Sequence, residues 1–292
     1  MSDRMIIENS MVTIETEEGA RFEHPESLLV EMLRQENTPP LGGNFLPDGI
    51  KFMEWRDPFL LVVHQYSPHV RRLLWIDERR SLMQHGPGVV YRPVRLSLPY
   101  TLVFAFFYRL GGKLYLTHNN ELYFRNQSFC CESDQLLFPA LLNISRIETP
   151  RRQRPWICTN YLECDPQSDW TQHLDLLLHH LWDGGFNLSS EQNGGASWYT
   201  LSKGIHRDLH PVKKWERATK KDPRFALSVP WTPVPLTFRE LVECIFEESF
   251  NPTTRRFLRG APLRKGGIPL AHRLMNFQLR AKGGRKTGGT DA

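Results

Sequence analysis

The stretch YTLVFAFFYRLGGKLYLTHNNELYFRN, residues 100–126, decides the fold class of this chain. It opens with a near-continuous run of aromatic, branched and other apolar residues, which is typical of a strand. Gly111-Gly112 then turns the chain into KLYLTH, and Asn119-Asn120 turns it again into ELYFRN. Two short turns that join three strands predict an antiparallel meander.

Two further elements are expected before the meander. Residues 25–36, PESLLVEMLRQE, carry apolar side chains at helical spacing and precede Pro39-Pro40, which predicts a helix that ends there. FLLVVHQY, residues 59–66, is joined through Ser-Pro-His to VRRLLWID, residues 70–77. This pattern predicts a β-hairpin.

Two helices are expected after the meander. Residues 169–185, DWTQHLDLLLHHLWDGG, place apolar side chains on one face and end on a Gly-Gly stop. Residues 237–250, TFRELVECIFEESF, open with a Thr237-x-x-Glu240 capping box. The apolar face of the first helix consists of Trp170, Leu174, Leu177, Leu178 and Leu181.

This order of elements predicts an α+β fold. We expect three parts: an N-terminal β-rich region with one helix at 1–95, a core at 96–250, and a basic, partly disordered tail at 251–292. The tail from Arg255 onward carries a net charge of +9, whereas the preceding residues carry −4. A concentrated basic end fits contact with nucleic acid or an acidic partner, and it equally fits a segment that only keeps the protein in solution.

Composition narrows the class of protein. At 292 residues with 40% apolar and 24% charged side chains, the chain is typical of a soluble globular protein. Its first residues show no secretory signal, and its longest apolar run is about half of what a membrane helix needs. The five cysteines are an odd number, which argues against a disulfide framework. We therefore expect a cytoplasmic protein with reduced thiols.

Motifs for several kinds of chemistry are missing. The sequence has no G-x-S-x-G elbow, no P-loop and no dinucleotide-type G-x-G-x-x-G. Cys158, Cys164, His206 and His210 are possible zinc ligands, but the spacing of the two cysteines is wider than in common structural zinc sites. We expect neither a metal nor a cofactor.

Cys158 is the strongest candidate for a reactive group. We expect it in an irregular segment between the meander and the helix at 169–185, where reactive groups are often displayed. Arg151, Arg152 and Arg154 precede it and would stabilise a thiolate. The alternative interpretation is a small buried hydrophobe beside Trp156. Among the other thiols, Cys244 is expected in the core, and Cys130-Cys131 half-buried near a sheet edge.

The stretches FPALLNI and WICTN, which end and begin near Asn143 and Cys158, resemble the active-site region of ubiquitin-conjugating enzymes. In that family an antiparallel meander leads through an asparagine motif to a cysteine and then to a helix. The segments LSLPYTLVF and SDQLLFPALLNI also resemble the prokaryotic ubiquitin-conjugating-like proteins of mobile elements, such as the PRTRC-system protein B family. The chain departs from the family motif in lacking its His-Pro pair and in separating Asn143 from Cys158 by 14 residues.

The resemblance implies a ubiquitin-conjugating-like fold with an extra N-terminal β-hairpin region. It also implies that Cys158 is the thioester nucleophile and that Asn143 supports the active-site loop and the oxyanion. The expected partners are then a ubiquitin-like modifier and its activating enzyme. The alternative is a non-catalytic plasmid or phage module for protein or nucleic-acid contact. For such contacts the candidates are Arg151, Arg152, Arg154, Arg255, Arg256, Arg259, Arg264 and Lys265.

Overall fold

A computed structural model describes residues 4–8, 11–15, 21–25, 48–83, 88–110, 113–159, 162, 164, 168–192 and 196–250. The helix expected at 25–36 lies outside these residues except for Pro25, which is the last residue of a strand, and the basic tail with Arg255, Arg256, Arg259, Arg264 and Lys265 also lies outside them. No helix in the described part is both long and apolar enough to cross a bilayer.

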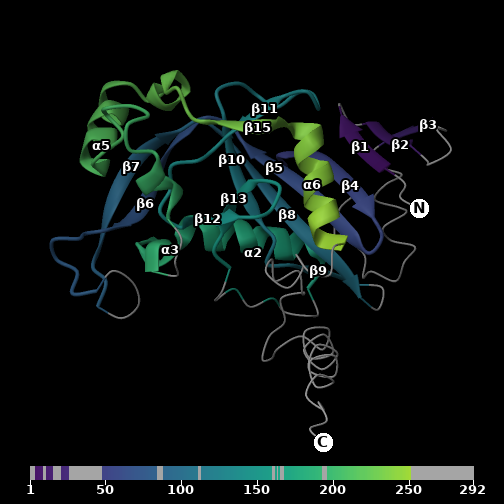
Figure 1. Ribbon diagram of the computed structural model, residues 1–292, viewed down its shortest axis with the longest axis horizontal. Coiled ribbons are helices and arrows are strands. Elements are labelled where there is room, and N and C mark those ends of the chain that lie inside the picture. The colour runs from purple at the N-terminus through teal and green to yellow at the C-terminus, as the bar shows by residue number, and fades with distance from the viewer. Residues whose placement is uncertain are drawn as a thin grey trace, which may run out of the picture.

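A nine-stranded antiparallel sheet forms the centre of the molecule (Figure 1). Its main path runs β12-β13-β10-β8-β5-β4, with β9 beside β8, β11 beside β10, and β15 beside β11. The strands are β4 (Ile50–Arg56), β5 (Phe59–Tyr66), β8 (Tyr100–Leu110), β9 (Lys113–Leu116), β10 (Glu121–Arg125), β11 (Gln135–Leu137), β12 (Ile144–Glu148), β13 (Gln153–Ile157) and β15 (Pro233–Thr237). The expected α+β class with antiparallel pairing is confirmed.

Two smaller sheets flank the large one. The first is antiparallel and consists of β1 (Arg4–Glu8), β2 (Met11–Glu15) and β3 (Arg21–Pro25). The second has the order β14-β6-β7, in which β6 and β7 are antiparallel and β14 joins β6 in parallel. Its strands are β6 (His69–Ile76), β7 (Tyr91–Leu98) and β14 (Gly185–Phe186). The boundary expected at residue 95 falls inside β7.

The helices are α2 (Trp170–Asp183), α3 (Ser189–Gln192), α4 (Trp198–Leu201), α5 (Val212–Lys221) and α6 (Phe238–Phe250), with a 3-10 turn at Phe225–Ser228. Helix α2 begins and ends as expected, since Asp169 caps it and Gly184 follows its last residue. In α6 the Thr237 N–H donates to Glu240 Oε2 at 2.8 Å, and the Glu240 N–H donates to Thr237 Oγ1 at 3.3 Å. The predicted capping box is confirmed.

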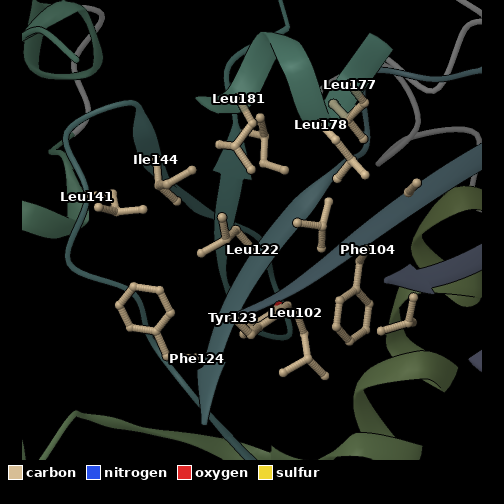
Figure 2. Close-up of a cluster of buried hydrophobic side chains, with 14 of the residues drawn as sticks. Leu102, Phe104, Leu122, Tyr123, Phe124, Leu141, Ile144, Leu177, Leu178 and Leu181 are labelled. Carbon is tan, nitrogen blue, oxygen red and sulfur yellow. The ribbon is translucent and has the colours of Figure 1, made fainter. Parts of the chain in front are cut away.

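Strand β8 is buried on both faces because α2 and α6 cover opposite sides of it. Phe107 meets Trp170 of α2, whereas Phe106 on the other face meets Phe246 of α6. Figure 2 shows part of this core, with Leu177, Leu178 and Leu181 of α2 packed towards the strands. Burial of each such leucine contributes about 2 kcal/mol. The continuous apolar run of β8 therefore follows from its two-sided burial.

The hairpin predicted from residues 59–66 and 70–77 is wrong in its pairing, although both strands exist. Strand β5 pairs with β4 and β8, whereas β6 pairs with β7 in the other sheet. Strand β5 is buried along nearly its whole length, but β6 alternates and exposes Arg72 and Leu74. An all-apolar strand is stable in the middle of a covered sheet, and an alternating one at a surface.

The predicted meander is confirmed for its first turn, since β8 pairs with β9 in antiparallel orientation, and it is wrong for its second. Strands β9 and β10 do not lie side by side, because both pair with β8, one after the other along the same edge. Between them the side chain of Asn120 replaces a missing backbone partner: its Oδ1 accepts from the Phe106 N–H at 3.0 Å, and its Nδ2 donates to the Thr117 carbonyl at 2.6 Å. Asn119-Asn120 is therefore an interruption in a strand, not a reversal.

Candidate functional site

The segment between Asn143 and Cys158 is a β-hairpin, so the prediction of an irregular segment is wrong for these residues and holds only for Cys158 itself, which follows the last residue of β13. Strands β12 and β13 pair in register from Ile144 with Ile157 to Glu148 with Gln153. Asn143 and Cys158 lie at the open end of this hairpin, where the Cys158 N–H donates to the Asn143 carbonyl at 3.5 Å. The hairpin thus brings the two residues named by the resemblance together.

Arg152 and Arg154 belong to this hairpin and point into the protein. Their side chains are 2% exposed and converge on Glu121, the first residue of β10, which is fully buried. Arg152 donates both Nη1 and Nη2 to the carboxylate at 2.6 and 2.8 Å, and Arg154 donates Nε at 2.6 Å. Arg152 also donates to Glu248 of α6 at 2.9 Å. The hairpin is therefore tied to the sheet and to α6.

The pKa of Glu121 reflects this arrangement. Burial alone would raise it, but the charges of Arg152 and Arg154, with hydrogen bonds from Arg152 and Tyr123, lower it to about 2. Burial alone would lower the pKa of the Arg152 guanidinium. The interactions with Glu121, Tyr123 and Glu248 outweigh this effect and raise the pKa. Both groups are ionised because each is the other's partner.

This placement differs from the expected role of the arginines. Arg152 and Arg154 cannot reach a partner at the surface, and their charges are already matched by carboxylates rather than directed at a thiolate. Arg151 alone of the three is exposed, and it forms an ion pair with Glu247. The sequence offered no signal for the role of Glu121, because its partners lie 31 and 33 residues away.

Asn143 connects the hairpin to the loop after α2. Its Nδ2 donates to the Gly185 carbonyl at 3.0 Å, and its Oδ1 accepts from the Asn187 N–H at 3.0 Å. A Cβ at Gly185 would lie 2.3 Å from the Tyr91 ring, so this close approach requires glycine. The amide of Asn143 has a second N–H, for which no partner is found among the described residues.

Cys158 is partly exposed at the end of β13, and a histidine from α2 positions its backbone. His180 Nε2 donates to the Cys158 carbonyl at 2.7 Å. The next residue, Thr159, is fully buried, and its Oγ1 lies 3.1 Å from His118 Nδ1. Cys158 therefore contacts the residue before β12 and the last turn of α2, and its neighbour Thr159 contacts the loop that follows β9. Sequence reasoning gave no role to His180, because position on α2 alone does not show which neighbour it meets.

The remaining thiols have different surroundings. Cys164 is buried, and burial raises the pKa of its thiol to about 12. Cys244 is only half-buried, so the prediction of a core residue is too strong, and Cys130 is exposed rather than half-buried. Cys131 is half-buried, as expected for one of that pair.

One group of possible metal ligands occurs in the described residues, and it is not the set read from the sequence. Ligand atoms of Cys130, Cys131 and Asp134 lie within 4.8 Å of one another. Asp134 already accepts both cysteine N–H groups and pairs with Arg125, which is the arrangement of a capped turn. His210, by contrast, lies 2.8 Å from Ser202 Oγ through its Nε2, and its ring contacts the Tyr199 ring in a tilted arrangement.

No family model, no curated protein and no solved structure matches this chain.

Proposed function

We propose that this chain is a ubiquitin-conjugating-like protein of a bacterial mobile element, which carries a small modifier as a thioester on Cys158. The observation that carries the proposal is the position of Asn143. Its backbone accepts from Cys158, while its side chain supports the loop at Gly185 and Asn187. A nucleophile, a supporting asparagine and the loop after the following helix thus lie together, in the order that the resemblance implies.

The reaction is a pair of acyl transfers. The Cys158 thiolate attacks the thioester carbonyl of the loaded modifier, a new C–S bond forms, and the donor's C–S bond breaks with release of the donor thiolate. An amine of the acceptor then attacks the new thioester, loses a proton, and displaces Cys158 as thiolate. The second N–H of Asn143 is the donor available for the oxyanion that develops in each step.

Cys158 can be tested with a peptide thioester that ends in Gly-Gly. We expect wild-type protein to acquire the peptide at Cys158, as shown by intact and tryptic mass spectrometry, and to lose it on addition of a thiol. Cys158→Ala should acquire none there, and Cys158→Ser should hold any acyl group as a thiol-resistant ester. Cys130→Ala is the matched control, because Cys130 is an exposed thiol on another segment. Equal labelling of Cys130 and Cys158 in the wild type would overturn the proposal.

A non-catalytic module for nucleic-acid contact is the second candidate. It is favoured by a basic surface on α5, far along the chain from Cys158. The cations of this surface have no carboxylate partners among the described residues. This candidate predicts that Cys158→Ala leaves the binding of nucleic acid unchanged, so the two candidates are separable.

A further inference from the structure

The surface that α5 presents is strongly basic. We use the name "α5 surface" for the exposed cations of this helix together with two exposed arginines, one from strand β6 and one from strand β7. The helix and the two strands lie at the left of Figure 1. Helix α5 contains five basic side chains and one acidic one. The members of the α5 surface are Arg72, Arg95, Lys213, Lys214, Arg217, Lys220 and Lys221.

The opposite face of α5 fixes the helix on β7. Trp215 is fully buried and donates its Nε1–H to the Ser97 carbonyl at 3.2 Å. Thr219 Oγ1 accepts the Ser97 N–H at 2.9 Å. The basic side chains are thus displayed on a helix with a defined position and not on a loose segment.

The cations of the α5 surface are not paired with carboxylates of the described part of the chain. Within the described residues, none of the seven forms an ion pair. Glu216, the only acidic residue of α5, forms its ion pair with Arg92 at 2.8 Å. Arg72 and Arg95 are direct cross-strand partners, which places like charges opposite one another. Such an arrangement is destabilising unless something neutralises it.

The helix dipole favours Lys220 and Lys221 in the last turn of α5, but helix stability does not explain the cations at its start. Lys213 and Lys214 lie in the first turn of α5, where the helix dipole disfavours cations by about 0.3–1 kcal/mol each. Pro211, at the N-cap, supplies no side-chain hydrogen bond. Lys213 and Arg217 are four residues apart, which adds like-charge repulsion. A bound anion would relieve both costs.

The α5 surface is hollowed on either side of Arg217. A groove of about 780 Å³ is lined by four cations, Arg95, Lys213, Arg217 and Lys220, and by one carboxylate, Glu216, which is paired with Arg92. A second hollow of about 320 Å³ lies on the other side and has a mixed lining, with the cations Lys214, Arg217 and Lys221 and the carboxylates of Asp208 and Asp222. Arg217 therefore lies between a mainly basic groove, which can accept an anionic group, and a second hollow of mixed charge.

We infer that the α5 surface binds the phosphodiester backbone of a nucleic acid without reading its sequence. Several unpaired cations spread along a helix of about 15 Å match a chain of regularly spaced phosphates. A protein partner would need buried apolar anchors. None of the large hydrophobic side chains exposed in the described ranges lies on α5, and Leu74 alone neighbours the surface. The inference is independent of Cys158 and of the basic tail.

The test measures binding of a mixed-sequence duplex of about 30 base pairs by fluorescence anisotropy, from about 50 to 200 mM NaCl. The full-length variant K213Q/R217Q/K220Q should bind about tenfold more weakly or worse at the lowest salt. Its slope of log affinity against log salt should be smaller by about 2–3. The control K51Q/R79Q/R80Q changes the same net charge at exposed positions elsewhere and should keep the wild-type slope.

Further variants separate the contributions. K213R/R217K/K220R keeps the charges and should bind like wild type, which excludes misfolding as the cause of a loss. R255Q/R256Q/R259Q/R264Q/K265Q measures the part supplied by the basic tail. An unchanged slope in K213Q/R217Q/K220Q would overturn the inference. So would competition by polyglutamate as strong as that by the duplex at equal charge, since the surface would then accept any polyanion.

Discussion

Two regions of this molecule are rich in basic residues, and they use them in opposite ways. Beside α6, Arg56 and Arg239 both bind Glu54, which is fully buried, with contacts of 2.7 and 2.6 Å. On the α5 surface, by contrast, the cations have no carboxylate partner among the described residues. The first group holds the sheet to the helix, whereas the second remains available to an external anion.

The difference comes from the carboxylates and not from the arginines. A buried carboxylate needs cationic partners, because an unpaired charge in the interior is very costly. Glu54 and Glu121 each form ion pairs with two arginines. Near α5 there is no such buried carboxylate in the described residues, so the cations stay at the surface. Basic residues can therefore be assigned to folding or to binding only when their acidic partners are located.

The largest effect is expected from Glu121→Gln, which removes the shared partner of Arg152 and Arg154. Two buried guanidinium groups would lose their main counter-charge, which costs about 3–5 kcal/mol of the free energy of unfolding. Urea unfolding followed by tryptophan fluorescence measures this loss. Glu78→Gln, an exposed position, is the control and should change stability by about 0.5 kcal/mol or less. A loss below about 1 kcal/mol for Glu121→Gln would show that the charges are not coupled.

The same network predicts how stability depends on pH. The pKa of Glu121 is about 2 in the folded protein against an ordinary value of 4.5. The unfolded chain therefore binds this proton more readily, and the contribution is fully present above pH 4.5 and is lost as the pH falls towards 2. Urea midpoints of the wild type should fall over this range. Glu121→Gln should show a flatter dependence, and parallel curves for the two proteins would contradict the assignment.

The smallest effect is expected on the α5 surface and has the opposite sign. K213Q/R217Q/K220Q removes like-charge repulsion of about 0.2–0.5 kcal/mol per pair, so the variant should melt about 1–3 °C higher than wild type at low salt. The gain should disappear at about 1 M salt, where screening is strong. Calorimetry at the two salt concentrations measures it. A lower melting temperature at low salt would mean that these cations stabilise the fold.

Local sequence patterns predicted the helices and strands far better than they predicted which strands pair with one another. Strand β8, helix α2 and the capping box of α6 are each specified by residues close together in the chain, and all are confirmed. The pairing of β5 and β10 depends instead on which neighbour buries an all-apolar strand. A Ser-Pro-His turn or an Asn-Asn pair carries no information about that choice.

In the candidate site, too, some features could be predicted from the sequence, and contacts between residues far apart in the chain could not. The resemblance pointed to Asn143 and Cys158, and the hairpin register brings their backbones together. The fate of Arg152 could not be predicted, since its partners lie 31 residues before it and 96 residues after it. The hydrogen bond from Asn143 to Gly185 could not be predicted either. It depends on the Tyr91 ring, which lies so close to Gly185 that no side chain fits there.

The contact between Arg152 and Glu248 has a consequence for the order of events during synthesis. Glu248 emerges from the ribosome 96 residues after Arg152, which is about 5–20 s at ordinary elongation rates. During that interval Glu121 is the only member of the network able to neutralise the hairpin that ends at Cys158. The nascent chain therefore completes this hairpin's packing late, and a cell in which elongation stalls before α6 would hold a hairpin that is paired with Glu121 but not yet joined to α6.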